Sequence, residues 1–376
     1  ASMKKDQGFW PATMYLEGLD QYRGWFQSSL LTAVGAFGEG APFKECVTHG
    51  WTVDGEGRAM HKSLGNGVDP ADIFNENGAD ILRLWAASAD YHADVRCSKA
   101  IFQQLSQNYL KFRNTCKFML DNLVDFDPAH LTKAEDMPVL DRWLITKLNE
   151  LIEKVEQSYN DYEFHIITHA VNDFCVTTLS SFYLDIVKDR LYCEAADSAE
   201  RRSAQTALYL TLSTLAKLFA PILAFTCDEI WLAMPHTAED DARNVVLNDM
   251  NKPFTAYALD AETMARWEHI IEVRTAVNGA LEEARAAKVI GKSLEADVHL
   301  TVPEGDVFLA DENPAALADL FIVSKVELTV GGELAVKVEN AAGTKCPRCW
   351  KHSLTPNAEG LCPRCAEVVR HLPDLL

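Results

Sequence analysis

Residues 14 to 26 read Met14-Tyr15-Leu16-Glu17-Gly18-Leu19-Asp20-Gln21-Tyr22-Arg23-Gly24-Trp25-Phe26. Two carboxylates, a glycine and an amide therefore crowd the entrance of a helix that the apolar spacing predicts over residues 22–34. If they are buried, these groups can bind an ammonium group, ribose hydroxyls or a ligand that approaches the backbone. The alternative is ordinary helix capping by Asp20, with Trp25 and Phe26 packed in a core.

A second stretch follows a predicted strand over residues 45–53 and reads Gly57-Arg58-Ala59-Met60-His61-Lys62-Ser63-Leu64-Gly65-Asn66. In this glycine-flanked stretch, Lys62 can reach phosphate oxygens and neutralise charge that develops during phosphoryl or adenylyl transfer, and Ser63 can add a hydroxyl donor. Gly65 supplies the backbone freedom that loop closure needs. On these letters alone, a solvated basic turn is the favoured interpretation.

The composition limits the classes of function. The chain has 376 residues and a formal net charge of −20 at pH 7, and this length accommodates roughly two to four domains. The acidic balance argues against a protein that coats nucleic acid unselectively, but it permits RNA binding through a local basic surface. No apolar run approaches the roughly 18 residues that span a bilayer, and no apolar leader opens the chain, so a cytoplasmic protein without membrane contact is expected.

The pattern along the chain predicts a mixed but predominantly α-helical fold. Strands and helices alternate at the front, where Asp69-Pro70 predicts a helix start. Long amphipathic stretches between residues 101 and 235 predict antiparallel helices joined by short loops. The expected segments are an α/β segment (1–98), a helical bundle (99–240), a small α/β module (241–340) and a cysteine-rich tail (341–376).

The α/β module is expected to contain one helix followed by strands. Residues 262–288 predict the helix, and residues 295–302 and 326–338 alternate as strands do. Gly331-Gly332 predicts a hairpin turn within the second of these stretches.

The chain has ten cysteines, which fall into two groups. Six are scattered through apolar or amphipathic segments, and we expect them to be small buried hydrophobic residues: Cys46, Cys97, Cys116, Cys175, Cys193 and Cys227. The other four form two C-x2-C pairs, Cys346/Cys349 and Cys362/Cys365, with twelve residues between the pairs. Four thiolates that converge in a closed tetrahedron suit one structural zinc ion, and a redox-active dithiol or disulfides are the alternatives.

The cysteine-rich tail is also locally basic. Arg348, Arg364 and two lysines, Lys345 and Lys351, lie near Trp350. An exposed tryptophan can stack on an unpaired base while arginines contact phosphate or base edges. Alternatively, Trp350 covers the zinc knuckle and the arginines are simply solvated.

Together, residues 14–26, His49-Gly50-Trp51 and the Lys62 stretch resemble, in order and spacing, the bacterial-type isoleucyl-tRNA synthetases. Valyl and leucyl enzymes share parts of this pattern, whereas the C-terminal C-x-x-C-Trp zinc module is similar to the one that ends the isoleucyl enzymes. Arg113-Asn114-Thr115 and residues 180–190 resemble the helical anticodon-binding domain of the same enzymes. The resemblance runs from Ala1 to about Arg370 and implies a partial class I Rossmann-like segment, anticodon-binding helices, a junction module and a zinc knuckle.

The resemblance also implies roles for residues near the front of the chain. In this family the position of Glu17 holds the aminoacyl-adenylate, and Gly18, Asp20 and Gln21 complete that wall of the site. His49 matches a histidine near the adenosine part of the ligand.

Lys62 matches the second lysine of the family's Lys-Met-Ser-Lys-Ser loop, which is assigned to ATP, and Ser63 follows it as in the family. Ala59 and His61 replace the first lysine and the first serine of that loop. These departures put in doubt how fully the loop stabilises departing pyrophosphate.

The resemblance implies an ATP-dependent ligase that activates isoleucine and esterifies tRNA(Ile), with Mg²⁺ accompanying ATP and one structural zinc. Arg113, Arg348 and Trp350 are the candidate tRNA contacts, and a monomer is expected. The family's His-Ile-Gly-His signature and its editing domain are absent from the chain, and the fragment alone is expected not to activate isoleucine. The competing hypotheses are a free-standing RNA-binding protein without catalysis and part of a valyl- or leucyl-type enzyme.

Overall fold

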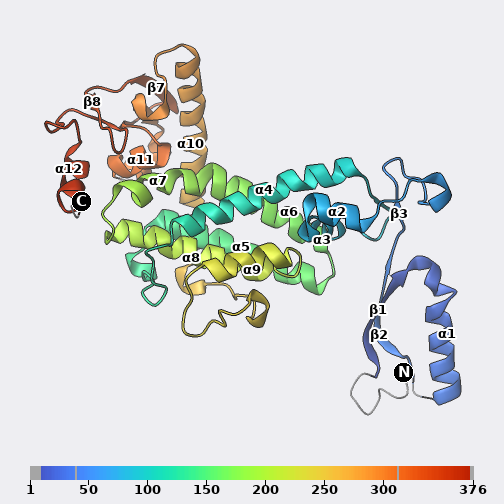
Figure 1. The fold of residues 1–376 in the computed structure, drawn as a ribbon. Helices are drawn as coiled ribbons and strands as arrows, with labels where there is room; N and C mark the ends of the chain where they lie inside the picture. The colour runs from blue at the N-terminus through green and yellow to red at the C-terminus, as the bar shows by residue number, and fades with distance from the viewer. Residues whose placement is uncertain (1–9, 39, 311–312, 373–376) are drawn as a thin grey trace. The chain divides into compact units, whose positions relative to one another are not determined.

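The computed structural model describes residues 10–38, 40–310 and 313–372, which cluster into two compact units. The first unit contains residues up to 111, together with 154–172 and 219–226. The second contains residues 112–153, 173–218 and the chain from 227 onward. Figure 1 shows a mainly helical chain with small sheets, so the prediction of a mixed, predominantly α-helical fold is confirmed.

A parallel pair of strands opens the first unit. Strand β1 (Ala12–Gly18) pairs with β2 (Phe43–His49), and the connection contains the short 3₁₀ turn η2 (Leu19–Tyr22), helix α1 (Trp25–Thr32) and the π-helical turn η3 (Ala33–Phe37). Parallel strands require such a crossover. The helix predicted over residues 22–34 is thus present, but it changes hydrogen-bonding pattern near both ends.

The strand predicted over residues 45–53 is broken in two at Gly50. Strand β2 ends at His49, and β3 (Thr52–Val53) pairs with β4 (Val95–Arg96) in a separate parallel ladder. Gly50 donates its N–H to the carbonyl of Tyr91 at 2.8 Å, and a Cβ at Gly50 would lie 2.3 Å from the carbonyl oxygen of Ala93. The break therefore depends on a close backbone approach that only glycine permits.

Two helices follow the Lys62 turn. They are α2 (Pro70–Asn77) and α3 (Ala79–Ser88). Asp69 caps α2 by accepting a hydrogen bond from the N–H of Ala71, and Pro70 takes the first helical position. The predicted helix start at Asp69-Pro70 is therefore confirmed.

The middle of the chain is helical, as predicted. Buried residues Leu144, Leu148 and Ile152 follow the expected spacing on one face of the second long helix. Within the long stretch that ends near residue 235, the turn that contains Pro221 separates two helices. The helices are α4 (Lys99–Asp121), α5 (Val139–Asn160), α6 (Phe164–Asp173), the π-helical η6 (Phe174–Tyr183), α7 (Leu184–Cys193), α8 (Ala199–Phe219) and α9 (Ala224–Ala233).

A buried carboxylate ties four of these elements together in the second unit. Asp141 of α5 is fully buried and accepts hydrogen bonds from the hydroxyls of Tyr183 at 2.8 Å and Ser203 at 2.5 Å. The guanidinium of Arg190 in α7 lies 3.1 Å away. A buried charge that is paired and hydrogen-bonded in this way is tolerated, so α7 has a fixed position against α5 and α8.

A three-stranded sheet follows helix α10 (Ala261–Ala286) in the second unit. Strand β5 (Ala296–Val302) lies in the centre, parallel to β6 (Lys325–Val330) and antiparallel to β7 (Ala335–Asn340). Helix α11 (Pro314–Phe321) makes the crossover from β5 to β6. The hairpin predicted at Gly331-Gly332 is wrong, because that turn carries the chain from β6 past β5 to the opposite edge.

The prediction that the six scattered cysteines are buried holds for five of them. Cys97, Cys116, Cys175, Cys193 and Cys227 are buried, whereas Cys46 is exposed. Cys46 lies on β2, whose neighbour β1 is the other strand of a two-stranded sheet; a sheet of this size leaves much strand surface uncovered. No helix in the described ranges is both long and apolar enough to cross a membrane.

Candidate functional site

The first candidate site lies where β1 and β2 end side by side. Their register places Glu17 opposite Thr48 and Gly18 opposite His49. The carboxyl ends of parallel strands are where α/β proteins bind ligands. Because side chains alternate along a strand, Glu17 shares its face of β1 with Tyr15, while Leu16 points to the other face. The register thus places the side chains of Glu17 and His49 on opposite faces of the pair.

Gly18 allows the two polar side chains beside it to approach closely. A Cβ on Gly18 would lie 2.8 Å from Oδ1 of Asp20 and 3.8 Å from Cε1 of His49. Gln21 donates to the Asp20 carboxylate at 3.0 Å, and its own carbonyl oxygen accepts the N–H of Trp25 at 3.0 Å. Gln21 is therefore the side chain that caps α1, a role that the alternative interpretation of the sequence gave to Asp20.

The Lys62 stretch forms a turn whose ends are tied together, and we call residues 57–65 the Lys62 loop. Its 3₁₀ turn η4 runs from Lys62 to Leu64, and the side chain of Lys62 lies outside the described part of the structure. Ser63 and His61 are exposed. Asp54 and Asn66 lie just outside the two ends of the loop. The Asn66 amide donates hydrogen bonds to the Asp54 carboxylate and to the carbonyl of Ala59, and the carboxylate also accepts one from Arg58. The sequence analysis did not identify these two residues as functional candidates. The signal that could have found them is that aspartate and asparagine, both common in turns, lie on either side of the loop.

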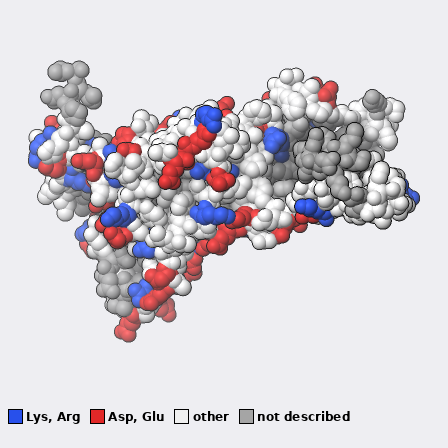
Figure 2. All heavy atoms as spheres, turned by 90° about the horizontal axis from the view of Figure 1, so that it is seen from below, with Lys and Arg blue, Asp and Glu red and all other residues white. Residues whose placement is uncertain are grey.

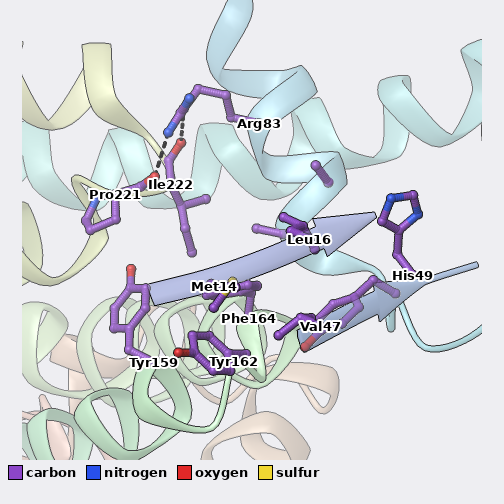
Figure 3. Close-up of a pocket in the computed structure, with 13 residues that line it drawn as sticks. Met14, Leu16, Val47, His49, Arg83, Tyr159, Tyr162, Phe164, Pro221 and Ile222 are labelled. Carbon is purple, nitrogen blue, oxygen red and sulfur yellow. Dashed lines mark hydrogen bonds between the residues drawn. The ribbon is translucent and has the colours of Figure 1, made fainter. Parts of the chain in front are cut away.

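A cavity of about 520 Å³ opens on the face of the strand pair opposite Glu17. Figure 3 shows Met14 and Leu16 of β1 with Val47 of β2 on one side, and Tyr159, Tyr162 and Phe164 lining it too. Arg83 also lines the cavity, but its guanidinium donates to the carbonyls of Pro221 and Ile222 at 2.6 and 2.9 Å. The lining suits an apolar group more than a phosphate.

The second candidate site is the cysteine cluster, which lies wholly in the second unit. The thiol sulfurs of Cys346, Cys349, Cys362 and Cys365 all lie within 4.8 Å of one another. Three of the four residues are buried, and Cys362 is partly buried. Four convergent sulfurs with no other ligand type are the donor set of a closed, structural zinc site. The predicted convergence of the two pairs is thus observed.

Short elements bring the two pairs together. Strands β8 (Thr344–Lys345) and β9 (His352–Ser353) form the first knuckle, and Cys362 is the N-cap residue of helix α12 (Pro363–Arg370). Burial disfavours the thiolate of Cys346, but hydrogen bonds from backbone N–H groups, including that of Cys349, outweigh burial and lower its pKa to about 6. A lowered pKa favours the deprotonated form that binds a metal, whereas burial raises the pKa of Cys349 and Cys365.

Two arginines of the tail fasten the cysteine cluster to α7. Arg364 forms a two-pronged ion pair with Asp189 at 2.5 and 2.8 Å and reaches Glu194 at 2.8 Å. Arg348 donates to the carbonyls of Cys193 and Tyr192 at the carboxyl end of α7. Positive charge at this end complements the helix dipole. The guanidinium of Arg348 is therefore engaged within the chain, which the sequence did not indicate.

Trp350 remains open to a ligand. Its side chain is 54% exposed, and its backbone adopts the left-handed conformation with φ +66°, which is uncommon for a residue with a bulky side chain. The ammonium nitrogen of Lys292 lies 5.5 Å from the ring centroid. An exposed ring beside a cation can stack on a flat aromatic ligand such as a base.

Arg113 lies exposed on α4, distant in sequence from the cysteine cluster. Figure 2 shows acidic and basic side chains interspersed over one face of the molecule. Any RNA contact on such a surface depends on a few basic or aromatic side chains, because the net charge of the chain is −20.

Two family models match the chain. Residues 2–98 match the tRNA synthetases class I (I, L, M and V) model, and residues 141–300 match the model of the anticodon-binding domain of tRNA ligase. The first match contains the strand ends and the Lys62 loop, and the second covers the helices from α5 to α10.

Curated relatives extend the similarity to nearly the whole chain. An isoleucine–tRNA ligase from Moorella thermoacetica is 47% identical over 96% of this chain, and one from Syntrophotalea carbinolica is 47% identical over 97%. In each case the match covers 41% of the relative. The chain thus spans about two fifths of the length of these relatives.

Solved structures agree on the fold. The ternary complex of Agrobacterium radiobacter K84 LeuRS with tRNA and LeuAMS has a TM-score of 0.52 at 16% identity, covering 88% of this chain and 38% of that one. A Mycobacterium tuberculosis methionyl-tRNA synthetase bound by methionyl-adenylate has a TM-score of 0.50 at 19% identity, and the match covers 60% of this chain and 45% of that one. The sequence matches, rather than these structures, favour the synthetase hypothesis over a free-standing RNA-binding protein.

Proposed function

Because the chain belongs to the isoleucine–tRNA ligase family, we propose that it is the C-terminal part of such a ligase. The whole enzyme would activate isoleucine with ATP, release pyrophosphate and transfer isoleucine to tRNA(Ile). This part would supply the Lys62 loop, one wall of the adenylate site, the anticodon-binding helices and a zinc module. The observation that carries the proposal is 47% identity over 96% of the chain to a curated isoleucine–tRNA ligase.

In the adenylate site, we assign the substrate contacts to the ends of β1 and β2. Glu17 would accept hydrogen bonds from the aminoacyl-adenylate, Gly18 would let the ligand approach the backbone, and His49 would lie near its adenosine. Asp20 and Gln21 would complete this wall. Support comes from the adjacency of Gly18 with Asp20 and His49 and from the position of all five residues at the carboxyl end of the strand pair.

In the Lys62 loop, Lys62 would contact the phosphates of ATP, and Ser63 would donate a hydroxyl hydrogen bond to them. Positive charge held at the phosphates stabilises the negative charge that moves onto departing pyrophosphate. Mg²⁺ would accompany ATP as part of the substrate. Because Ala59 stands where the family has the first lysine of the loop, Lys62 would supply more of the positive charge that stabilises pyrophosphate.

The cysteine cluster would hold one zinc ion through four thiolates. Bound zinc would stabilise the fold of the tail and take no part in the chemistry, because four cysteines leave no open coordination position. The docked tail would present Trp350 to an unpaired base of tRNA. Arg348 would orient this surface from its bonds to α7, and Arg113 is a further candidate contact on α4.

The test of the tRNA assignment is a binding measurement on this chain. We expect the zinc-loaded chain to bind tRNA(Ile) more tightly than tRNA(Val), because anticodon-binding helices and the zinc module are both present. Trp350→Ala should weaken binding by about tenfold, the loss of about 1–3 kcal/mol of stacking. Val330→Ala, at another partly exposed apolar side chain, is the control. Equal affinity for both tRNAs, unaffected by Trp350→Ala, would contradict the assignment.

A further inference from the structure

We propose that Asp54 and Asn66 are positioning residues that fix the conformation of the Lys62 loop before a nucleotide binds. We call the pair the Asp54–Asn66 clamp. The inference rests on the function proposed above, since it gives the clamp a role in the handling of ATP phosphates. It concerns residues beyond those that the family resemblance singled out.

Asp54 lies at the start of the clamp and uses both carboxylate oxygens. Asp54 is buried, with only 6% of its surface exposed. Oδ1 accepts the backbone N–H groups of Glu56 and Arg58 at 3.0 and 2.9 Å. Oδ2 accepts Nε of Arg58 and Nδ2 of Asn66, each at 2.9 Å. Four donors on one carboxylate fill its acceptor sites, so this side chain has one orientation.

Asn66 completes the clamp from the other end of the loop. Its Nδ2 also donates to the carbonyl of Ala59 at 3.1 Å, and its Oδ1 accepts the N–H of His61 at 2.9 Å. The arrangement needs two donors and one acceptor on a single flat group, which only an amide side chain offers. Lys62 and Ser63 lie within the span that these bonds close.

Backbone contacts reinforce the same geometry. The backbone N–H of Asp54 donates to the carbonyl of Arg58 at 2.9 Å, and the backbone carbonyl of Asp54 accepts the N–H of Gly57 at 3.0 Å. Val53 also forms an isolated antiparallel bridge with Ala59. Gly57 adopts φ +84°, which favours glycine. A loop ordered in this way before binding loses less conformational entropy when it meets its ligand.

The charges of the clamp are balanced within the loop. The hydrogen bond from Asn66, followed by that from the N–H of Arg58, holds the pKa of Asp54 well below its usual range, so the carboxylate stays ionised. Arg58 balances it and also reaches Glu56 at 3.2 Å. Arg58 is thus committed within the loop, and Lys62 remains the cation of the loop to which the phosphate contact is assigned.

The clamp explains how the loop tolerates its two departures from the family pattern. Ala59 contributes its carbonyl oxygen and His61 its backbone N–H. Neither bond uses a side chain, so replacing lysine by alanine at 59 and serine by histidine at 61 removes functional groups without removing the clamp. The shape of the loop is therefore retained while its charge is reduced.

The first experiment measures the order of the loop in this chain by limited trypsin digestion. Asn66→Ala should raise the rates of cleavage after Arg58 and Lys62 by about tenfold or more, because cleavage follows the population of the open loop. Asp54→Asn should act in the same direction. Asp69→Asn, the same chemical change at a nearby helix cap, is the control and should leave both rates unchanged. Wild-type cleavage rates in Asn66→Ala would overturn the clamp.

The second experiment places the variants in the full-length ligase and measures isoleucine-dependent ATP–pyrophosphate exchange. Asn66→Ala should lower kcat by about tenfold and leave the KM for isoleucine within about twofold, since the loop acts on phosphates. Adding Asp54→Asn to Asn66→Asp restores one amide–carboxylate bond and should recover part of the loss seen with Asn66→Asp alone. A loosened loop with unchanged kcat would overturn the positioning role. Absence of exchange in the wild-type enzyme would instead contradict the proposed function, while the trypsin result would still decide the clamp.

Discussion

The cysteine cluster and the strand ends differ in how much of a site this chain provides. Four sulfurs between Cys346 and Cys365 meet within 4.8 Å and need no further ligand. At the strand ends, Glu17, Asp20 and His49 are exposed, and the register puts Glu17 and His49 on opposite faces. A site made from one short segment is complete when that segment folds, whereas a site made at strand ends needs the walls that neighbouring elements supply.

The largest effect should come from breaking the complete site. Cys365→Ala removes one of the four proposed zinc ligands, and a structural zinc site contributes about 10 kcal/mol or more to folding a small segment. We expect bound zinc to fall from about one ion per chain to nearly none, and residues 346–365 to become sensitive to protease.

The control for this change is Cys175→Ala, because Cys175 and Cys365 are both fully buried. Cys175→Ala should retain zinc and lose only about 1 kcal/mol of stability through a small cavity. Metal content measured by atomic spectroscopy checks both variants, and full zinc occupancy in Cys365→Ala would contradict the four-cysteine site.

The next largest effect concerns the Lys62 loop, which belongs to the site that is only partly supplied by this chain. In the full-length ligase, Lys62→Ala should lower the kcat of pyrophosphate exchange by about 10²–10³-fold, the usual cost of removing a preorganised electrostatic group. Lys99→Ala is the control, because Lys99 pairs with Glu76 at 2.9 Å in the same unit and lies outside the loop. Equal kcat values for the two variants would remove Lys62 from the chemistry.

A smaller effect should separate docking of the zinc module from its folding. Arg364→Gln leaves Asp189 without its two-pronged partner and should lower the free energy of unfolding by about 1–3 kcal/mol. Arg370→Gln, in the same helix but paired with Glu367 on the surface, should cost less than about 0.5 kcal/mol. Urea denaturation of both zinc-loaded variants checks this difference, and equal midpoints would show that the docking pair contributes nothing.

The smallest effect is a pH dependence in the helical part. The hydrogen bond from Arg201, opposed by partial burial, lowers the pKa of Asp125 to about 2, below the ordinary value of about 3.9. Because the folded-state pKa is the lower one, this contribution is fully present above about pH 4 and is lost as the pH falls toward 2. Asp125 is partly exposed, so the loss should stay under about 1 kcal/mol.

Asp125→Asn should flatten this part of the stability curve. Thermal unfolding of the wild-type chain and the variant between pH 5 and 2.5 measures the difference. Parallel curves over this range would contradict the assignment to Asp125.

The sequence was sufficient where a pattern is local. Three of the features predicted from residues close together in the sequence are present in the structure. They are the helices between residues 101 and 235, the cap at Asp69 and the two cysteine pairs. The Gly331-Gly332 turn was misjudged because alternation identifies strands but leaves their partners open, and β5 takes the central place. Arg364 was assigned to solvent or RNA because its partner, Asp189, is far away in the sequence. The Asp54–Asn66 clamp was missed for a related reason, since its bonds depend on how the loop closes.

The central proposal is that this chain would hold a complete zinc site but only part of the adenylate site of an isoleucine–tRNA ligase. Isoleucine-dependent ATP–pyrophosphate exchange, measured side by side on the zinc-loaded chain and on the full-length enzyme, tests it most directly. The account predicts exchange by the full-length enzyme and none by the chain alone. Exchange by the chain alone, or its absence from the full-length enzyme, would contradict the account.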